Sequence, residues 1–238
     1  MPKFGSWLDI PSPQVAEIMA QSGFDFIVVD LEHGPASIET AQMQLMAIGA
    51  RCLSVVRVPE GTEAWIKRVL DTGADGVMIP KVESAKQAAE MVACAFYAPK
   101  GRRGDAREVV RASGWGRDSD AYKKTWNSNG FLAVQIESVE GLSNIEQIAA
   151  TKGVSQLFFG PSDFSADAGL SIDSDETLAA AGKVAKVATA HGLASGSVVF
   201  PNGTLQSLAE LGFTHISVTG DVTTLTHGLK ESLENAKR

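Results

Sequence analysis

The sequence predicts an α/β protein of the (β/α)₈ TIM barrel class, and three observations lead to that fold class. Short apolar runs of the kind that form buried strands alternate with amphipathic stretches of helical periodicity. Eight such runs can be counted along the 238 residues. A barrel of this type takes about 250 residues as one domain, whereas an open doubly wound sheet seldom needs eight strands. We therefore expect residues 1–238 to form a single barrel domain.

The expected strands are short apolar runs, and Phe26–Val29 is rich in β-branched residues, as a strand buried on both faces of a parallel sheet is. In chain order they are Phe4–Leu8, Phe24–Val29, Leu53–Val58, Gly76–Ile79, Phe131–Ile136, Gln156–Phe159, Ala194–Val199 and His215–Val218. Between them, apolar residues recur at helical spacing, for example at Val15, Ile18 and Met19. Ser12 and Ser37 precede two of these stretches, and we expect both to cap helices.

One connection is much longer than a plain helical crossover. Between the fourth and fifth strands the chain runs from Ser84 to Gly130, and Ser84–Phe96 is the expected helix. The remainder forms a basic insertion, because residues 100–124 carry eight basic and four acidic side chains in a protein of net charge −7. This insertion either packs on a neighbouring subunit or forms a lid that carries cations toward an anionic substrate.

The last stretch, Val222–Arg238, has the pattern of an amphipathic helix in which Leu225, Leu229 and Leu233 recur every four residues. Such a stripe needs an apolar surface to cover it. The helix either closes its own barrel or packs against a partner, and the sequence favours neither arrangement.

Composition excludes several classes of function. The net charge of −7 argues against a nucleic acid or an anionic membrane as partner of the whole protein. Cys52 and Cys94 are the only cysteines and lie far apart, so neither a disulfide framework nor a cysteine-ligated zinc site is expected. No apolar run approaches the roughly 18 residues that span a membrane, and the amino terminus lacks the apolar core of a signal peptide. We expect a cytoplasmic protein that acts on small molecules.

The active site of such a barrel lies at the carboxyl ends of its strands. Glu137 and Asp163 follow two strands that are neighbours in the expected barrel. Paired carboxylates that face one cavity repel each other unless a proton or a cation lies between them. Mg²⁺ or Mn²⁺, which prefer oxygen ligands, would suit this pair. The alternative is that Asp163 only caps the following helix. The other polar residues at strand exits are Trp7, Asp9, Asp30, Glu32, His33, Arg57, Lys81, Gln135 and Asp221.

Three of these exits indicate further chemistry. Asp30, Glu32 and His33 crowd one turn after a buried strand, which is an unusual concentration of ionisable groups. A buried Arg57 needs an anion, which is either a structural carboxylate such as Glu32 or Glu137 or a ligand. Lys81 could be a Schiff-base nucleophile, or a surface lysine at the start of a helix.

Several motifs in a fixed order resemble a known family over nearly the whole chain. They are Gly5-Ser-Trp7-Leu, Asp30-Leu-Glu-His-Gly-Pro35, Val56-Arg57-Val-Pro, Leu70-Asp71-Thr-Gly-Ala-Asp-Gly-Val-Met-Ile-Pro80, Gly101-Arg-Arg-Gly104, Val134-Gln-Ile-Glu137 and Phe159-Gly-Pro-Ser-Asp163. Together they resemble the metal-dependent pyruvate aldolases of the HpcH/HpaI group, which includes 2-dehydro-3-deoxyglucarate aldolase and 4-hydroxy-2-oxo-heptanedioate aldolase.

The resemblance implies a class II aldolase that reversibly cleaves a 4-hydroxy-2-oxo acid to pyruvate, or a close analogue, and an aldehyde. Glu137 and Asp163 would bind the divalent ion, Mg²⁺ or Mn²⁺ or also Co²⁺. His33 would be the base, and Asp30 or Asp71 would orient it. Arg57 would stabilise the enolate. The substrate would be held by Gln135, Gly160, Ser162, Arg57 and Trp7.

The resemblance also implies a homohexamer, a trimer of dimers, in which Asp71 reaches the site of a neighbouring subunit. Two other hypotheses stay open beside the metal-dependent one. The first is a Schiff-base aldolase that uses Lys81 on the same barrel. The second is a non-catalytic barrel that binds a keto acid. The aldehyde, the preferred metal and the pathway do not follow from the sequence.

Overall fold

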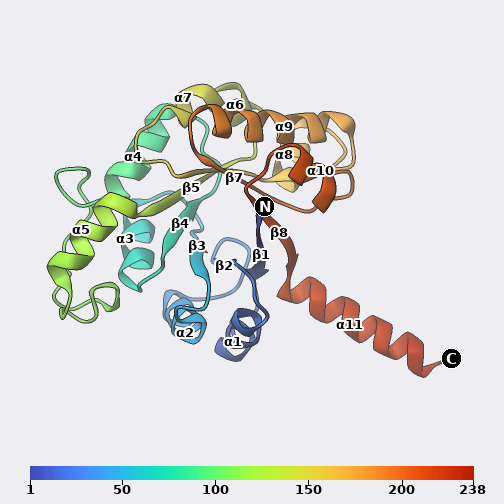
Figure 1. Ribbon diagram of the computed structural model, residues 1–238, viewed down its shortest axis with the longest axis horizontal. Coiled ribbons are helices and arrows are strands. Elements are labelled where there is room, and N and C mark those ends of the chain that lie inside the picture. The colour runs from blue at the N-terminus through green and yellow to red at the C-terminus, as the bar shows by residue number, and fades with distance from the viewer.

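The computed structural model describes residues 1–238 and contains a closed barrel of eight parallel strands that pair in the order of the chain (Figure 1). The first and last strands also pair with each other, which closes the sheet. The predicted fold class is therefore confirmed, and all eight expected strands are present. They are β1 (Lys3–Leu8), β2 (Phe26–Asp30), β3 (Leu53–Arg57), β4 (Gly76–Ile79), β5 (Phe131–Ile136), β6 (Gln156–Phe159), β7 (Ala194–Val198) and β8 (His215–Gly220).

The bounds of β4, β5 and β6 are the predicted ones, and the other five strands differ from the prediction by one or two residues at an end. The difference is informative at β2 and β3, which end at Asp30 and Arg57. These two terminal residues are partners in the parallel register of the two strands. A carboxylate and a guanidinium therefore stand side by side at the mouth of the barrel.

Helices surround the barrel, and the predicted caps are confirmed. Ser12 Oγ accepts a hydrogen bond from the N–H of Val15, and Ser37 Oγ accepts one from the N–H of Thr40. None of the helices combines the length and apolarity that crossing a bilayer requires. They are α1 (Pro13–Gln21), α2 (Ile38–Ile48), α3 (Glu63–Asp71), α4 (Ala85–Ala95), α5 (Ser119–Asn129), α6 (Val139–Ser143), α7 (Ile145–Ala149), α8 (Pro161–Ala168), α9 (Asp175–Ala190), α10 (Leu205–Glu210) and α11 (Asp221–Ala236).

The inside of the barrel changes from apolar to polar along the strands. Successive inward side chains on one strand are two residues apart. Arg57 therefore follows Val55 on the inner face of β3, and Gln135 follows Ala133 on that of β5. The lower layer is a separate apolar cluster that fills the barrel and supports the polar layer at its mouth. This cluster consists of Phe26, Val28, Val55, Met78, Ala133 and Phe158.

The basic insertion folds beside α3, away from the barrel mouth (Figure 1). It contains α5 and a 3₁₀ helix, Arg111–Ser113. Its cations serve local contacts: Arg103 forms an ion pair with Asp71 at 2.7 Å, and Arg107 pairs with carboxylates of the insertion and α5. None of its residues lines the pocket at the strand ends. The insertion therefore does not form a lid over the pocket of its own chain, which was one of its two predicted roles.

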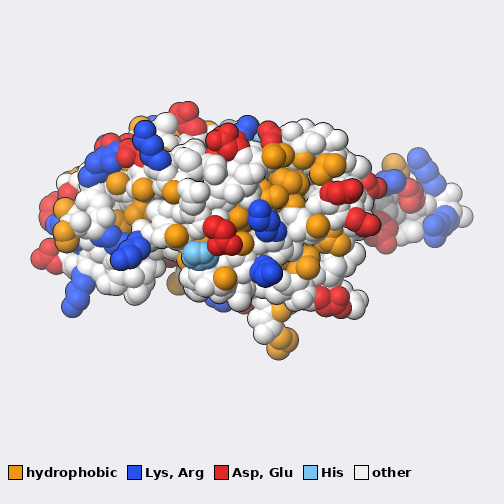
Figure 2. All heavy atoms as spheres, turned by 90° about the horizontal axis from the view of Figure 1, so that it is seen from above, with side chains coloured by type: hydrophobic (Ala, Val, Ile, Leu, Met, Phe, Trp, Pro, Cys, Tyr) orange, Lys and Arg blue, Asp and Glu red, His pale blue; other side chains and the backbone are white.

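The final helix, α11, projects away from the barrel instead of lying against it (Figures 1 and 2). Its main contacts with the barrel are with β1 and β8. The apolar stripe predicted for this helix is uncovered, because Leu225, Leu229 and Leu233 are 53%, 63% and 56% exposed. Of the two predicted arrangements, closure of the chain's own barrel is not observed.

Candidate active site

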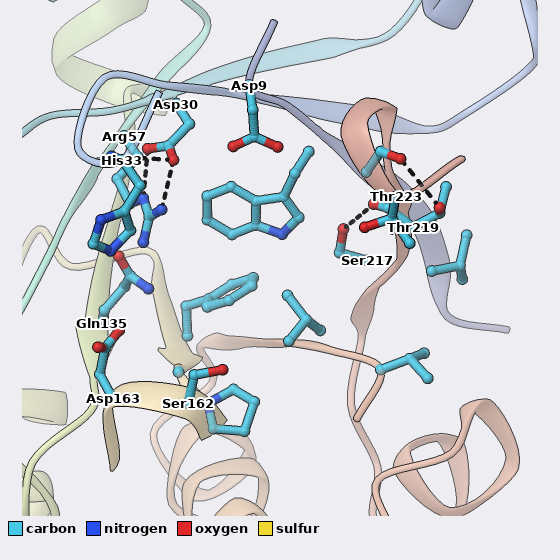
Figure 3. A pocket seen from close by; sticks show the side chains of 18 residues that line it. Asp9, Asp30, His33, Arg57, Gln135, Ser162, Asp163, Ser217, Thr219 and Thr223 are labelled. Carbon is cyan, nitrogen blue, oxygen red and sulfur yellow. Dashed lines mark hydrogen bonds and ion pairs between the residues drawn. The ribbon is translucent and has the colours of Figure 1, made fainter. Parts of the chain in front are cut away.

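A cavity of about 480 Å³ opens at the carboxyl ends of the strands (Figure 3). Glu137 is adjacent to it beside Gly160. Asp71 and Lys81, also proposed from the sequence, do not line it. The structure brings together in its wall the other predicted site residues, which are Trp7, Asp30, His33, Arg57, Gln135, Gly160, Ser162 and Asp163.

A buried ion pair between Asp30 and Arg57 forms one side of the cavity. The guanidinium donates from Nε to Oδ1 and from Nη2 to Oδ2, both at 2.8 Å. Burial opposes the charged form of Asp30, but the two hydrogen bonds and the charge of Arg57 outweigh it and lower the pKa of this carboxyl. A second carboxylate, that of Glu32, lies 2.8 Å from Arg57 Nη1. The anion that Arg57 required is therefore structural, as one of the two sequence interpretations had it.

Arg57 is also fixed from the side by an aromatic ring. Its guanidinium lies over the ring of Trp7, 4.4 Å from the centroid. Trp7 in turn packs edge-on against Phe158, with ring centroids 5.9 Å apart. The indole Nε1 of Trp7 is buried and has no hydrogen-bond partner in the chain. A buried donor without a partner costs free energy, and a polar group of a ligand would remove that cost if it reached this N–H.

Asp30 organises the turn that presents His33. Its carboxylate accepts hydrogen bonds from the backbone N–H groups of Glu32 and His33, at 3.0 and 3.3 Å. No hydrogen bond joins Asp30 to the imidazole, which is exposed. Asp30 thus positions His33 through the backbone and not through the ring. Figure 3 shows the imidazole beside Arg57, on the same side of the cavity as Gln135 and Asp163.

Glu137 is a buried carboxylate with one free oxygen. Its Oε1 accepts a hydrogen bond of 2.7 Å from the backbone N–H of Lys81, and its Oε2 has no partner. Burial first, and then the charges of Glu32 and Asp163, raise the pKa of Glu137 to about 7. Lys81 adopts a left-handed conformation, φ 47°, which a residue with a side chain seldom does. The left-handed backbone accompanies this hydrogen bond, and the Lys81 side chain is exposed.

Gly160 leaves room for the free oxygen of Glu137. A Cβ atom at this position would lie 2.6 Å from Glu137 Oε2, far inside contact distance. Gly160 also precedes α8, whose first turn holds Ser162 and Asp163. The N–H groups at a helix start have no partner within the helix and attract anions. No side chain caps α8, so Asp163 does not serve as its cap.

The free oxygens at this end of the cavity suit a hard cation. Glu137 Oε2 and Gln135 Oε1 are both buried without partners, and the Asp163 carboxylate lies on the same side of the cavity. No group of three or more His, Cys, Asp or Glu side chains is arranged to hold a metal ion. A cation here would therefore have two carboxylate ligands at most, and water or substrate would complete its shell. Mg²⁺ and Mn²⁺ bind at sites of this kind.

Asp71 lies elsewhere, on the outside of the barrel. Its carboxylate pairs with Arg103, and it lines a separate surface groove with Arg111 and Trp115. Within one chain it does not approach His33. The role implied for it by resemblance therefore requires a second subunit.

The sequence did not indicate the opposite half of the cavity. This half is formed by the ends of β7 and β8 and the first turn of α11. Its residues carry hydroxyl or small apolar side chains, which occur at many strand ends, and no signal in the sequence distinguishes them. They are Val198, Val199, Ser217, Val218, Thr219, Gly220 and Thr223.

Comparison with known proteins identifies similar sequences and structures. Residues 3–228 match the family described as HpcH/HpaI aldolase/citrate lyase. The hydroxypyruvate/pyruvate aldolase of Paraburkholderia phytofirmans is 38% identical, over 99% of this chain and 94% of its own. The 4-hydroxy-2-oxovalerate aldolase of Novosphingobium aromaticivorans is 41% identical, over 71% of this chain and 64% of its own. The crystal structure of an HpcH/HpaI aldolase/citrate lyase family protein from Burkholderia cenocepacia J2315 superposes with a TM-score of 0.93, 34% identity and coverage of 100% and 95%.

Proposed function

The chain belongs to the HpcH/HpaI aldolase/citrate lyase family, and on this premise we propose that it is an aldolase. The reaction is the reversible cleavage of a 4-hydroxy-2-oxo acid to pyruvate, or a close analogue, and an aldehyde. Relatives named hydroxypyruvate/pyruvate aldolase and 4-hydroxy-2-oxovalerate aldolase support the keto acid as substrate class.

One observation carries the metal-dependent form of this proposal. Glu137 and Gln135 each have a buried oxygen without a partner, next to a cavity that Asp163 also lines. Glu137 and Asp163 would hold a divalent cation such as Mg²⁺ or Mn²⁺. When bound, the cation would supply a Lewis acid for the keto oxygen of the substrate.

The rest of the site supports binding and cleavage of the substrate. The start of α8 and the amide of Gln135 would bind the carboxylate of the keto acid. His33 is exposed to the cavity and would remove the proton from the hydroxyl at C4. The C3–C4 bond then breaks, the aldehyde leaves, and the bonding electrons form the enolate of pyruvate. Protonation at C3 completes the reaction.

Arg57 would stabilise the charge that develops on the enolate oxygen. It has five N–H donors, more than the contacts with Asp30 and Glu32 occupy. The two carboxylates hold the guanidinium in place and also keep it charged. Burial alone would lower the pKa of Arg57, but Asp30 and Glu32 raise it. A donor fixed before the reaction needs no reorganisation when the charge appears.

The Schiff-base alternative has less support. A lysine nucleophile must reach the keto carbon in the cavity. The side chain of Lys81 is exposed and does not line the cavity, whereas its backbone N–H supports Glu137.

We further propose that the protein works as a homo-oligomer, with hexamers as the expected form. The leucine stripe of α11 is uncovered within the chain, and another copy would supply the apolar surface that covers it. Asp71 lies at a groove that carries the exposed side chain of Trp115, and this groove would face a neighbouring site.

Chelation and borohydride trapping test the metal-dependent aldolase against its alternatives. The purified protein is treated with a chelator, and pyruvate release from 4-hydroxy-2-oxovalerate is then measured. We expect release to stop, to return on addition of Mn²⁺ or Mg²⁺, and borohydride with pyruvate to leave Lys81 unlabelled. Labelled Lys81 with chelator-resistant activity would establish the Schiff-base mechanism. No cleavage with either ion, despite pyruvate binding, would establish a non-catalytic barrel.

A further inference from the structure

The cavity continues beyond the residues that the proposed reaction uses. Pyruvate is a three-carbon acid, and its proposed contacts all lie near Gln135 and the start of α8. The opposite half of the cavity, toward β8 and α11, is where the aldehyde portion of a longer substrate would lie (Figure 3). The side chains of this half therefore determine which aldehyde the enzyme accepts.

Hydrogen-bonding oxygens line this half, and cations do not. Ser217, Thr219 and Thr223 contribute hydroxyl groups. No lysine lines the cavity, and the single arginine is already paired with two carboxylates. An aldehyde that carries a second carboxylate would find no counter-ion here, whereas one that carries hydroxyl groups would find partners.

Asp9 is the charged cavity residue that borders this half, because a Cβ atom at Gly220 would lie 3.6 Å from its Oδ2. It follows β1, and Figure 3 shows its carboxylate at the cavity wall, near Asp30. Its position is fixed because the N–H groups of Asp9 and Ile10 donate to the Asp221 carboxylate, at 3.0 and 2.8 Å. No N–H or neutral O–H group of the chain donates to the Asp9 carboxylate, whose neighbours Asp30 and Asp221 are themselves carboxylates. It is thus an acceptor with a fixed backbone in the wall of the cavity.

The charge of Asp9 depends on its surroundings. Burial, together with the neighbouring carboxylates of Asp30 and Asp221, raises the pKa of Asp9 to about 6. The group is still ionised in most molecules at neutral pH and above, so it accepts hydrogen bonds and repels anions.

We propose that Asp9 is a specificity-determining residue, which selects neutral hydroxyaldehydes by accepting a hydrogen bond from a hydroxyl group and rejects aldehydes that carry a carboxylate. This inference rests on the proposed aldolase function. It assigns a task to a residue that takes no part in breaking the C–C bond.

The test measures aldol synthesis by the full-length enzyme with Mn²⁺, pyruvate and one of two aldehydes. Glyceraldehyde is neutral and hydroxylated, and succinic semialdehyde carries a carboxylate. The measured quantity is the ratio of their kcat/KM values, which cancels any general loss of activity in a variant. We expect wild type to prefer glyceraldehyde by about tenfold or more, and Asp9→Asn to reduce that ratio by about tenfold.

Two further variants serve as controls. Asp25→Asn removes one carboxylate at the opposite end of the barrel, before β2, and should leave the ratio unchanged. Asp9→Glu keeps the charge and should keep the preference, which also provides a result if Asp9→Asn does not fold.

The inference fails if wild type prefers succinic semialdehyde, or if Asp9→Asn and wild type give the same ratio. Deuterium exchange at the methyl group of pyruvate separates this failure from failure of the proposed function. If wild type catalyses exchange and turnover, and Asp9→Asn has the same ratio of kcat/KM values as wild type, only the role of Asp9 is refuted. Absence of both exchange and turnover in wild type would refute the aldolase itself.

Discussion

Asp30 and Arg57 lie opposite each other in the register of β2 and β3, and their side chains form an ion pair. They end adjacent strands at paired positions, and their side chains form two parallel hydrogen bonds of 2.8 Å. Both side chains are almost completely buried. The pair therefore joins the turn that presents His33, which Asp30 organises, to the proposed enolate-binding group.

Replacing Arg57 should affect both stability and catalysis. Arg57→Ala leaves the buried carboxylate of Asp30 without a partner, which should lower the free energy of unfolding by about 3 kcal/mol. We also expect kcat/KM for cleavage to fall by about a hundredfold or more, with the fold retained. Arg57→Lys keeps the charge but loses the paired hydrogen bonds, so it should be intermediate. Near-normal turnover by Arg57→Ala would mean that its role is only structural.

His33→Ala should separate the two halves of the reaction. The imidazole is exposed, so the free energy of unfolding should change by no more than about 0.5 kcal/mol. Cleavage of the C–C bond should be lost, while deuterium exchange at the methyl group of pyruvate, which needs no hydroxyl deprotonation, should survive in part. Equal loss of both activities would remove His33 from the role of base.

Gly160→Ala should disrupt the proposed metal site without unfolding the barrel. The added methyl group would collide with Glu137 Oε2, so we expect Mn²⁺ affinity, measured by calorimetry, to fall about tenfold or more. Gly169→Ala is the matched control at the other end of α8. Gly169 has φ 64° and open space around it, so this change should cost about 1 kcal/mol of stability yet leave Mn²⁺ affinity unaltered. Unchanged affinity in Gly160→Ala would contradict the assignment of Glu137.

Glu137 should make the metal-free protein less stable as the pH rises. Its folded pKa of about 7 lies above the ordinary 4.5, so the native state holds the proton more tightly than the unfolded chain does. The cost of the buried charge is fully present above pH 7 and disappears as the pH falls toward 4.5. Metal-free Glu137→Gln should therefore exceed wild type in unfolding free energy by about 3 kcal/mol at pH 8, and by little at pH 4.5. Denaturant titrations at the two pH values measure the difference, and a constant difference would refute the raised pKa.

The proposed oligomer should depend on the leucine stripe of α11. Leu225→Lys combined with Leu229→Lys places two charges on the uncovered face, and we expect a smaller assembly in sedimentation velocity. Glu231→Lys, on another face of the same helix, should leave the sedimentation coefficient unchanged. An unaltered assembly in the leucine variant would show that α11 lies outside the interface.

Much of the fold follows from local patterns. The strands were predictable because most of them are short apolar runs, and the order of a β–α repeat dictates which strands are neighbours. The same reasoning found the ionisable residues of the site, since charged groups at buried strand ends are rare. It could not determine the partner of Arg57, because Glu32, Glu137 and a ligand all fitted, and Asp30 became its main partner only through strand register.

Other features depend on contacts that a sequence pattern does not encode. The left-handed backbone of Lys81 accompanies a hydrogen bond to a residue 56 positions away. The hydroxyl-lined half of the cavity consists of ordinary serine, threonine and valine. The direction of α11 is a third case, because an apolar stripe shows that a helix needs a neighbour without showing whether that neighbour is its own barrel.

The direction of α11 has one more consequence. Its first residue, Asp221, holds the backbone of Asp9 and Ile10, and its first turn places Thr223 in the cavity wall. Under the proposed assembly, the same helix lies on another subunit, so a tilt imposed at the interface would move the part of the cavity that meets the aldehyde. Assembly and ligand binding would then be thermodynamically linked: whatever tightens one must tighten the other by the same factor.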